Sequence, residues 1–136
     1  MKVILDEAAI MPTRAHETDA GMDLYTRYDE IVPARGYAIF DTGVHIEIPE
    51  GYVGFLKSKS GLNVKHHLTS DGVIDAGYTG SIVVKLYNHS DMSYHFKAGE
   101  KITQLVILPC LLDTLELVDS FEDTDRGSSG FGSTGK

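Results

Sequence analysis

The sequence predicts an all-β protein, built as a sandwich or a barrel. Short apolar runs are separated by turn residues about every dozen positions, which is the spacing of short strands joined by tight turns. No long segment shows the 3.6-residue period of an amphipathic helix. The chain has 136 residues with 42% hydrophobic content, close to the usual size of a single domain. We therefore expect one β-rich core.

The clearest strand pattern lies in the first half of the chain. Residues 44–48 alternate between apolar and polar side chains, as a half-buried strand does, and Pro49-Glu50-Gly51 supplies a turn. Residues 52–56 follow as a second apolar run, so the two segments are predicted to form a hairpin. Pro33-Ala34-Arg35-Gly36 separates two further short runs in the same way.

The second half of the chain predicts a central strand and a short helix. Residues 102–108 are apolar on both faces except for Thr103 and Gln104, which indicates a strand covered on both sides, where the Gln104 amide needs a partner. One short helix is predicted between Leu62 and His67. It is entered through Ser60-Gly61, because serine is a good N-cap.

The composition changes after Glu122. Residues 126–136 are rich in glycine and serine, and such a segment cannot bury enough apolar surface to order itself alone. We predict a core of residues 1–122 and a flexible tail of residues 123–136.

Charge and composition exclude several functional classes. The formal net charge of -8 argues against a nucleic-acid binder, which normally needs an excess of Lys and Arg. No apolar stretch approaches the ~20 residues of a membrane helix, and the apolar N-terminal run is too short for a signal peptide. Cys110 is the only cysteine, so we expect no intramolecular disulfide and no cysteine-based metal site. These features predict a soluble, cytoplasmic protein.

The tail contains the groups of a phosphate clamp. Its glycines let backbone amides approach an anion, Ser133 and Thr134 supply hydroxyls, and Arg126 supplies a guanidinium. Phe131 is an aromatic side chain that could stack on a nucleotide base. A mobile terminus without a role has the same composition, so composition alone leaves both interpretations open.

Residues 71–80 are predicted to form a tight hairpin near a surface pocket. Glycines and aspartates bracket the apolar pair Val73-Ile74, and Tyr78 follows. Asp75 is a candidate general base, because an ionised carboxylate can take a proton from a positioned water. The alternative is that Asp75 only completes a turn, a role that aspartate often has.

Three further segments carry weaker signals. Residues 57–62 group lysines and serines ahead of the predicted helix, which indicates either an anion site or a solvated basic loop. In residues 19–25, Asp23 could hold a metal directly or through water. Residues 99–105 are the third of these weaker segments. The six histidines show no metal-ligand spacing.

Taken in order, these five segments closely resemble the five motifs of the trimeric dUTP pyrophosphatase (dUTPase) family. The matching segments are residues 20–25, 58–62, 72–75 with Tyr78 and Gly80, 99–105, and 126–135. The resemblance spans nearly the whole chain. It implies a jelly-roll β fold assembled as a homotrimer, in which each active site is built from three subunits and closed by the tail of a neighbour.

The resemblance also implies a reaction and a set of roles. Asp75 would activate water for attack on the α-phosphorus of dUTP, releasing dUMP and pyrophosphate, which clears dUTP from the nucleotide pool and supplies dUMP for dTMP synthesis. Mg²⁺ would bridge the phosphates, with Asp23 holding it through water. Substrate binding is assigned to Lys59, Ser60, Gly61, Gly72, Val73, Ile74, Tyr78, Gln104, Arg126, Phe131, Gly132, Ser133 and Thr134.

Within that set, the contacts divide along the nucleotide. Ser60 and Gln104 would contact the inner phosphates and the tail the outer ones. Backbone groups of residues 72–78 would bind uracil, and Tyr78 would pack on the deoxyribose. Lys59 and Lys101 stand where the family commonly has arginine, so a bidentate phosphate contact becomes a single point charge.

Two alternatives stay open beside hydrolysis of dUTP. A dCTP deaminase of the same fold has a similar hairpin, but deaminases place a Glu base where this chain has Lys85. A non-catalytic trimer that senses nucleotides or binds a protein is the other possibility. The presence of both Asp23 and Asp75 favours hydrolysis.

Overall fold

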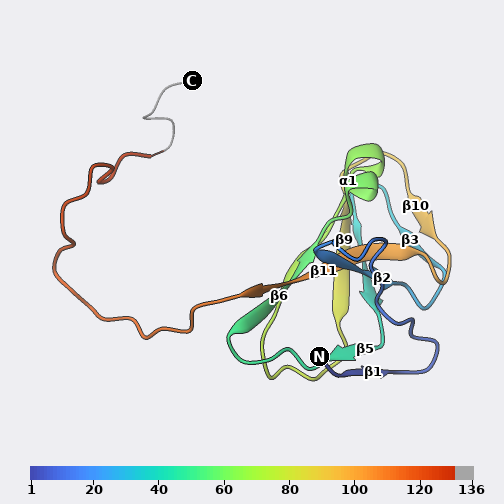
Figure 1. Cartoon of the computed structure of the whole chain (residues 1–136). Coiled ribbons are helices and arrows are strands. Elements are labelled where there is room, and N and C mark those ends of the chain that lie inside the picture. The colour runs from blue at the N-terminus through green and yellow to red at the C-terminus, as the bar shows by residue number, and fades with distance from the viewer. Residues whose placement is uncertain (131–136) are drawn as a thin grey trace.

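The computed structural model describes residues 1–130, so Phe131, Gly132, Ser133 and Thr134 lie outside the described residues. Strands and one helix occupy the chain from Val3 to Pro109 (Figure 1). In chain order they are β1 (Val3–Leu5), β2 (Gly21–Tyr25), β3 (Glu30–Val32), β4 (Tyr37–Asp41), β5 (Val44–Ile46), β6 (Tyr52–Lys57), α1 (Ser60–His66), β7 (Leu68–Thr69), β8 (Asp71–Ile74), β9 (Val83–Asn88), β10 (Tyr94–Phe96) and β11 (Lys101–Pro109).

The strands form antiparallel sheets that enclose an apolar core. The main sheet has the order β2-β11-β6-β8, and a second sheet has the order β4-β9-β7. The pairs β1-β5 and β10-β3 complete the sandwich. Inward side chains of both sheets meet in the core, among them Leu24, Leu56 and Leu105 from the main sheet and Phe40 and Leu86 from the second. The expected all-β, jelly-roll type of fold is confirmed.

Strand β11 is the central strand that the sequence predicts. It pairs with β2 on one side and with β6 on the other. Ile102, Thr103 and Leu105 have no exposed surface. Gln104 has the partner that its position demands, since its Nε2 donates to the backbone oxygen of Ser58 at 3.2 Å.

The prediction that residues 44–56 form a hairpin is wrong. The turn itself forms, with the Tyr52 amide donating to the Pro49 oxygen at 3.2 Å. Strand β5, however, pairs with β1, and both edges of β6 are taken by β11 and β8. Because β6 has no free edge, the chain passes from one sheet to another at this turn.

The short helix is confirmed, with a different beginning. Helix α1 begins at Ser60, which makes Lys59 the N-cap residue, and no side chain caps it. Ser60 is therefore not the cap that the sequence suggests. The helix ends where His67 adopts a left-handed conformation with φ 56° and its amide donates to the Asn63 oxygen at 3.0 Å.

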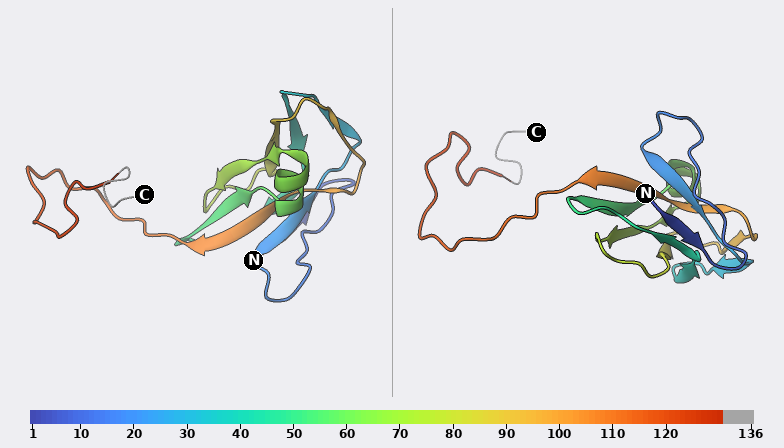
Figure 2. Two further views of the ribbon diagram at one scale, coloured as in Figure 1. Left: turned by 90° about the horizontal axis from the view of Figure 1, so that it is seen from above. Right: turned by 60° about the horizontal axis from the view of Figure 1, so that its bottom comes forward.

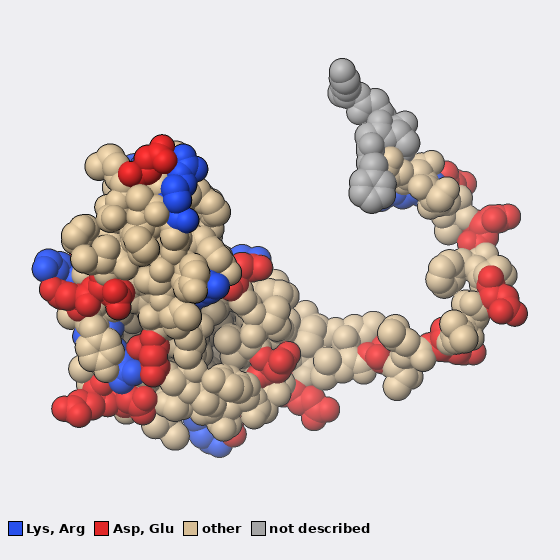
Figure 3. Space-filling model, turned by 180° about the vertical axis from the view of Figure 1, so that it is seen from behind, with Lys and Arg blue, Asp and Glu red and all other residues tan. Residues whose placement is uncertain are grey.

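The chain leaves the core after β11. Residues 110–130, which we call the C-terminal arm, form no helix or strand and run away from the sandwich in both views of Figure 2. Acidic side chains are spaced along the arm (Figure 3). Its apolar side chains are exposed, with Leu111 at 88%, Leu115 at 102% and Phe121 at 90%. The core-to-tail boundary after Glu122 stays a prediction, while the last strand ends at Pro109.

No helix among residues 1–130 has the length and apolar character needed to cross a bilayer.

Candidate active site

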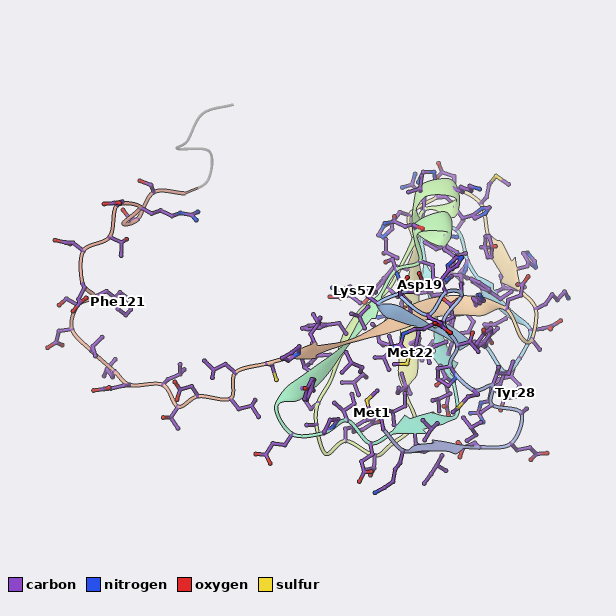
Figure 4. The ribbon with its side chains drawn as sticks, in the orientation of Figure 1. Met1, Asp19, Met22, Tyr28, Lys57 and Phe121 are labelled. Carbon is purple, nitrogen blue, oxygen red and sulfur yellow. The ribbon has the colours of Figure 1, made fainter. Side chains whose placement is uncertain are left out.

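A polar groove lies where β2, β6 and β11 run side by side. Its volume is about 420 Å³. Asp19 and Lys57, both labelled in Figure 4, belong to its lining. The full lining is Ala15, Asp19, Ala20, Gly21, Asp23, Lys57, Lys59, Gln104 and Val106. The groove therefore brings together residues from three of the five sequence segments.

Strand register explains why these side chains meet. Gln104 of β11 lies opposite Asp23 of β2 on one side and opposite Lys57 of β6 on the other. Residues directly opposite each other in neighbouring strands point to the same face of the sheet. Lys59 follows β6 by two residues and N-caps α1, so its ammonium reaches the same place.

Asp23 is buried in the groove and paired with two cations. Its side chain is only 7% exposed, Lys59 Nζ contacts Oδ1, and Lys101 Nζ lies 2.7 Å from Oδ2. Burial alone raises the pKa of the Asp23 carboxyl, but the hydrogen bonds and charges of Lys101 and Lys59 outweigh burial and hold its pKa below the ordinary value. Asp23 is therefore a carboxylate at neutral pH, and it holds both lysines at the groove.

A buried hydroxyl network supports the segment between β6 and α1. Ser58 Oγ donates to the Ser70 backbone oxygen at 3.0 Å and accepts from the Ser70 amide at 2.9 Å. The Ser70 hydroxyl is hydrogen-bonded to Thr103 Oγ1 at 2.7 Å, and Thr103 donates to the Lys57 oxygen at 3.0 Å. Sequence reasoning missed this network, although Thr103 in an otherwise apolar strand was its signal.

Asp75 lies on the segment between β8 and β9. The Tyr78 amide donates to the Asp75 oxygen at 3.2 Å, and Gly77 has φ 83°, so the predicted turn forms. The flanking strands do not pair across it, because β8 pairs with β6 while β9 pairs with β4 and β7. The predicted hairpin is thus corrected to a loop that joins two sheets. Its backbone lies beside a surface pocket of about 880 Å³, which Ala76, Gly77 and Thr79 help to line.

The Tyr78 ring folds back onto its own loop. Its hydroxyl donates to the Ser81 backbone oxygen at 2.9 Å, and the side chain remains 45% exposed. A Cβ atom on Gly80 would overlap the Tyr78 hydroxyl, so glycine is required for this close approach. Asp75 is exposed and forms no ion pair within residues 1–130.

Within one chain, Asp75 and the polar groove lie at opposite ends of the same strand pair. The β6–β8 register runs from Lys57 opposite Asp71 to Gly54 opposite Ile74. Three residues of strand span about 10 Å, and Asp75 and Lys59 lie beyond the two ends. A single chain therefore does not bring the candidate base to the groove.

The groove suits a metal ion that is brought in by a bound ligand. It suits a metal ion held by protein side chains alone less well. Within residues 1–130 no three His, Cys, Asp or Glu side chains are grouped to hold an ion. Asp23 is the single carboxylate of the groove with little exposed surface, and both of its oxygens face lysines. Mg²⁺ commonly binds one or two carboxylates together with substrate phosphates and water, and this donor set is compatible with that mode.

Beyond Leu112, which helps to line the pocket beside the Asp75 loop, the described part of the C-terminal arm runs away from the core of its own chain (Figure 1). Arg126 Nε donates to the Ser129 backbone oxygen at 3.2 Å, a contact within the arm. Phe121, labelled in Figure 4, also lies on the arm, apart from the core. The predicted contacts of Phe131, Gly132, Ser133 and Thr134 lie outside the described residues.

Comparison with known proteins gives one consistent result. The dUTPase family pattern matches residues 7–135. A probable deoxyuridine 5'-triphosphate nucleotidohydrolase of Schizosaccharomyces pombe is 44% identical over 132 residues, which cover 96% of this chain and 94% of that protein. The deoxyuridine 5'-triphosphate nucleotidohydrolase of Clostridium tetani is 40% identical over 136 residues, covering 98% and 94%.

Solved structures agree with the sequence relatives. The Staphylococcus bacteriophage 80alpha dUTPase with dUpNHpp superposes with a TM-score of 0.94 at 36% identity, over 99% of this chain and 98% of that chain. A mutant dUTPase from phage phi11 of S. aureus, which coordinates a structural Mg(II) ion, has a TM-score of 0.83 at 34% identity over 90% and 98%. With its five segments, its fold and these full-length matches in agreement, the chain belongs to the dUTPase family.

Proposed function

We propose that this chain hydrolyses dUTP to dUMP and pyrophosphate, with Asp75 as the base that activates water for attack on the α-phosphorus. The full-length match to a dUTPase that binds dUpNHpp carries this conclusion. Asp75 is exposed on a loop and has no cation partner in the described chain, so its carboxylate is available to accept a proton from water.

The polar groove supports the role of phosphate binder. Lys59 and the Gln104 amide belong to the lining, and Lys101 adds a second positive charge through its ion pair with Asp23. The hydroxyl of exposed Ser60 follows Lys59 directly in the chain, at the start of α1. Together they complement the negative charge of a triphosphate and offer hydrogen-bond donors to its oxygens. Asp23 balances the lysines before substrate binds and keeps their ammonium groups in position.

Mg²⁺ fits this site as a partner of the substrate. Asp23 is the residue that would hold it, through water, while substrate phosphates complete the coordination. Bound there, the metal neutralises phosphate charge and fixes the phosphate geometry. The chain's own share of that task is to present the Asp23 carboxylate, and Lys59 and Lys101 show that this carboxylate attracts cations.

The separation of Asp75 and the polar groove supports a homotrimer with shared active sites. Because one chain holds them at opposite ends of the β6–β8 pair, we assign the loop of a second subunit to the groove of the first. Beyond Leu112 the described C-terminal arm leaves the core of its own chain, and its exposed leucines need a covering surface. A neighbouring subunit supplies that surface, and Arg126 with Phe131, Gly132, Ser133 and Thr134 then closes a neighbour's site.

Selection of deoxyuridine is assigned to strand β8 and the loop that follows it. Backbone groups of Gly72, Val73 and Ile74 bind the uracil edge, and Tyr78 packs on the deoxyribose and excludes a 2′-hydroxyl. When the wrong base leaves buried polar groups of the binding site unpaired, the site can discriminate against that base by about 10⁴-fold. Hydrolysis of a soluble nucleotide supports the expected cytoplasmic location.

A substrate panel tests this function. With Mg²⁺, dUTP should yield dUMP and pyrophosphate, whereas dTTP, dCTP and UTP should be turned over at least about 10³-fold more slowly, because their extra groups meet the backbone reader or Tyr78. Chromatography of the products identifies the reaction. Ammonia and dUTP formed from dCTP would indicate a deaminase, binding without turnover would indicate a sensor, and equal rates for all four nucleotides would contradict the assigned specificity.

Gly21 is predicted to keep space for Gln104. A Cβ atom at Gly21 would overlap Gln104 Oε1, so Gly21→Ala should push the amide away from the Ser58 oxygen. We expect KM for dUTP to rise about tenfold, the value of one hydrogen bond to a charged group, with little change in the melting temperature. Steady-state kinetics measure this. In a Gln104→Ala background Gly21→Ala should add little, and an undiminished effect there would show that it acts elsewhere.

A further inference from the structure

His45 connects strand β5 to the loop that carries Asp75. The ring Nδ1 lies 2.7 Å from the Thr79 backbone oxygen, one residue after Tyr78. The ring Nε2 lies 3.2 Å from Asp6 Oδ1, in the segment that follows β1. The imidazole therefore bridges a carboxylate to the backbone of this loop, and its side chain is only 24% exposed.

This bridge is well placed to control the loop. At the far end of the loop, the Ile82 amide donates to the Val44 oxygen at 2.9 Å, and at the near end Ile74 pairs with Gly54. In the part of the chain that the structure describes, the His45 contact is the one hydrogen bond that joins residues 75–80 to a strand. The turn that carries Asp75 and Tyr78 is thus held at its tip by one imidazole.

Both ring nitrogens of His45 face hydrogen-bond acceptors. The imidazolium form has two N–H donors and satisfies the Thr79 carbonyl and the Asp6 carboxylate together. A neutral ring has one N–H, so it can satisfy either the Thr79 carbonyl at 2.7 Å or the charged Asp6 carboxylate at 3.2 Å, but not both. Loss of one proton therefore leaves Thr79 and Asp6 competing for a single N–H, which weakens the hold on the loop.

The charges around His45 favour the protonated ring. The hydrogen bond to Thr79 and the charges of Asp6 and Asp41 raise the pKa of His45 above its ordinary value, against a smaller opposing effect of burial. Arg27 partly neutralises the negative charge of these carboxylates, because its guanidinium lies 3.0 Å from Asp41 Oδ2 and 3.9 Å from Asp6 Oδ2.

Lys2 and Glu47, whose side chains also line the surface beside His45, form an ion pair with each other at 2.9 Å. Their charges offset one another, so Asp6, Asp41 and Arg27 set the electrostatic environment of the ring.

We propose that protonated His45 is a positioning residue for catalysis, which holds the Asp75–Tyr78 turn in its working position and holds it less firmly when the imidazole loses its proton. This inference rests on the proposed role of Asp75. The direction with pH follows from the raised pKa. The contact is complete below the pKa of an unfolded histidine and is weakened as the pH rises through the higher pKa of the folded protein.

The first test measures the loop without substrate, so it does not depend on hydrolysis. The Tyr78 amide donates to the Asp75 oxygen within this turn. Its hydrogen-exchange protection factor, corrected for the intrinsic pH dependence of exchange, should fall about tenfold between about pH 6 and pH 9 in the unliganded wild type. Asp6→Asn removes the competing carboxylate, so the neutral ring keeps its proton for Thr79 and protection should change little with pH. Protection in the wild type that is constant with pH would overturn the proposal.

The second test compares variants of His45 in dUTP hydrolysis at the same two pH values. His45→Ala should lower kcat/KM about tenfold relative to wild type at about pH 6 and much less at about pH 9, where the contact is weakened in the wild type too. The ratio of the two enzymes cancels the titration of the substrate phosphates. His45→Gln retains an amide donor that does not titrate, and it should restore most of the loss at about pH 6.

The outcomes separate the possible failures. A His45→Ala deficit of equal size at both pH values means that His45 is only structural, which contradicts the proposal. If His45→Ala does not fold, the hydrogen-exchange comparison of the wild type with Asp6→Asn still tests the proposal. If the chain does not hydrolyse dUTP, the proposed function fails, while pH-dependent protection of the Tyr78 amide still establishes the contact.

Discussion

Asp75→Asn is expected to lower kcat for dUTP hydrolysis by about 10²- to 10⁴-fold, the usual contribution of a positioned general base. The amide has the size of the carboxylate but cannot take a proton from water. Because Asp75 is exposed and forms no ion pair in the described chain, the change should leave the melting temperature unaltered. Release of pyrophosphate gives the rate, and calorimetry with a non-hydrolysable dUTP analogue gives the affinity.

Asp91→Asn is the matched control for that experiment. Asp91 is also an exposed aspartate, 82% accessible, and its partner is the surface residue Arg35 at 2.7 Å. It lies outside both the polar groove and the loop, so its replacement should leave kcat unchanged. A loss of affinity equal to the loss of rate in Asp75→Asn would show that Asp75 binds substrate rather than activating water.

Mixing two inactive variants is expected to restore activity. One variant is Asp75→Asn, and the other is truncated after Asp125 and lacks the end of the tail. If loop and tail at one site come from different subunits, exchanged trimers contain sites with an intact loop from one chain and an intact tail from another. Each variant alone should have almost no activity, whereas the mixture should hydrolyse dUTP.

The size of the recovery distinguishes the assemblies. In random trimers formed from equal amounts of the two chains, half of the loops and half of the tails are intact, so about one quarter of the sites are complete. The rate should therefore reach about one quarter of the wild-type rate after refolding together. If exchange is verified by mass spectrometry and no activity returns, loop and tail act within one chain and the shared-site arrangement is wrong.

Local patterns were reliable wherever a single segment decides the structure. The apolar run of residues 102–108 predicted a central strand, and β11 is central because β2 and β6 occupy both of its edges. The breaker-free segment after Ser60 predicted α1 to within two residues, although Lys59 and not Ser60 is its N-cap.

Pairing between segments was predicted less well. The hairpin of residues 44–56 and the hairpin of residues 71–80 both have the expected turns, but the strands around each turn pair elsewhere. Turn residues determine local backbone angles, whereas partner choice depends on which distant strand covers the same apolar face. That information is not contained in the turn.

The sequence by itself determined the β class, the five ordered motifs and the candidate residues Asp23, Asp75 and Gln104, because residue type and spacing encode chemistry locally. Only the tertiary structure decided how they are grouped. The register of β2, β6 and β11 brings Asp23 and Gln104 into one groove, and the β6–β8 register keeps Asp75 away from it. The contact between His45 and Thr79 likewise joins residues that are 34 positions apart. Such proximity arises from long-range strand pairing, which requires the folded chain.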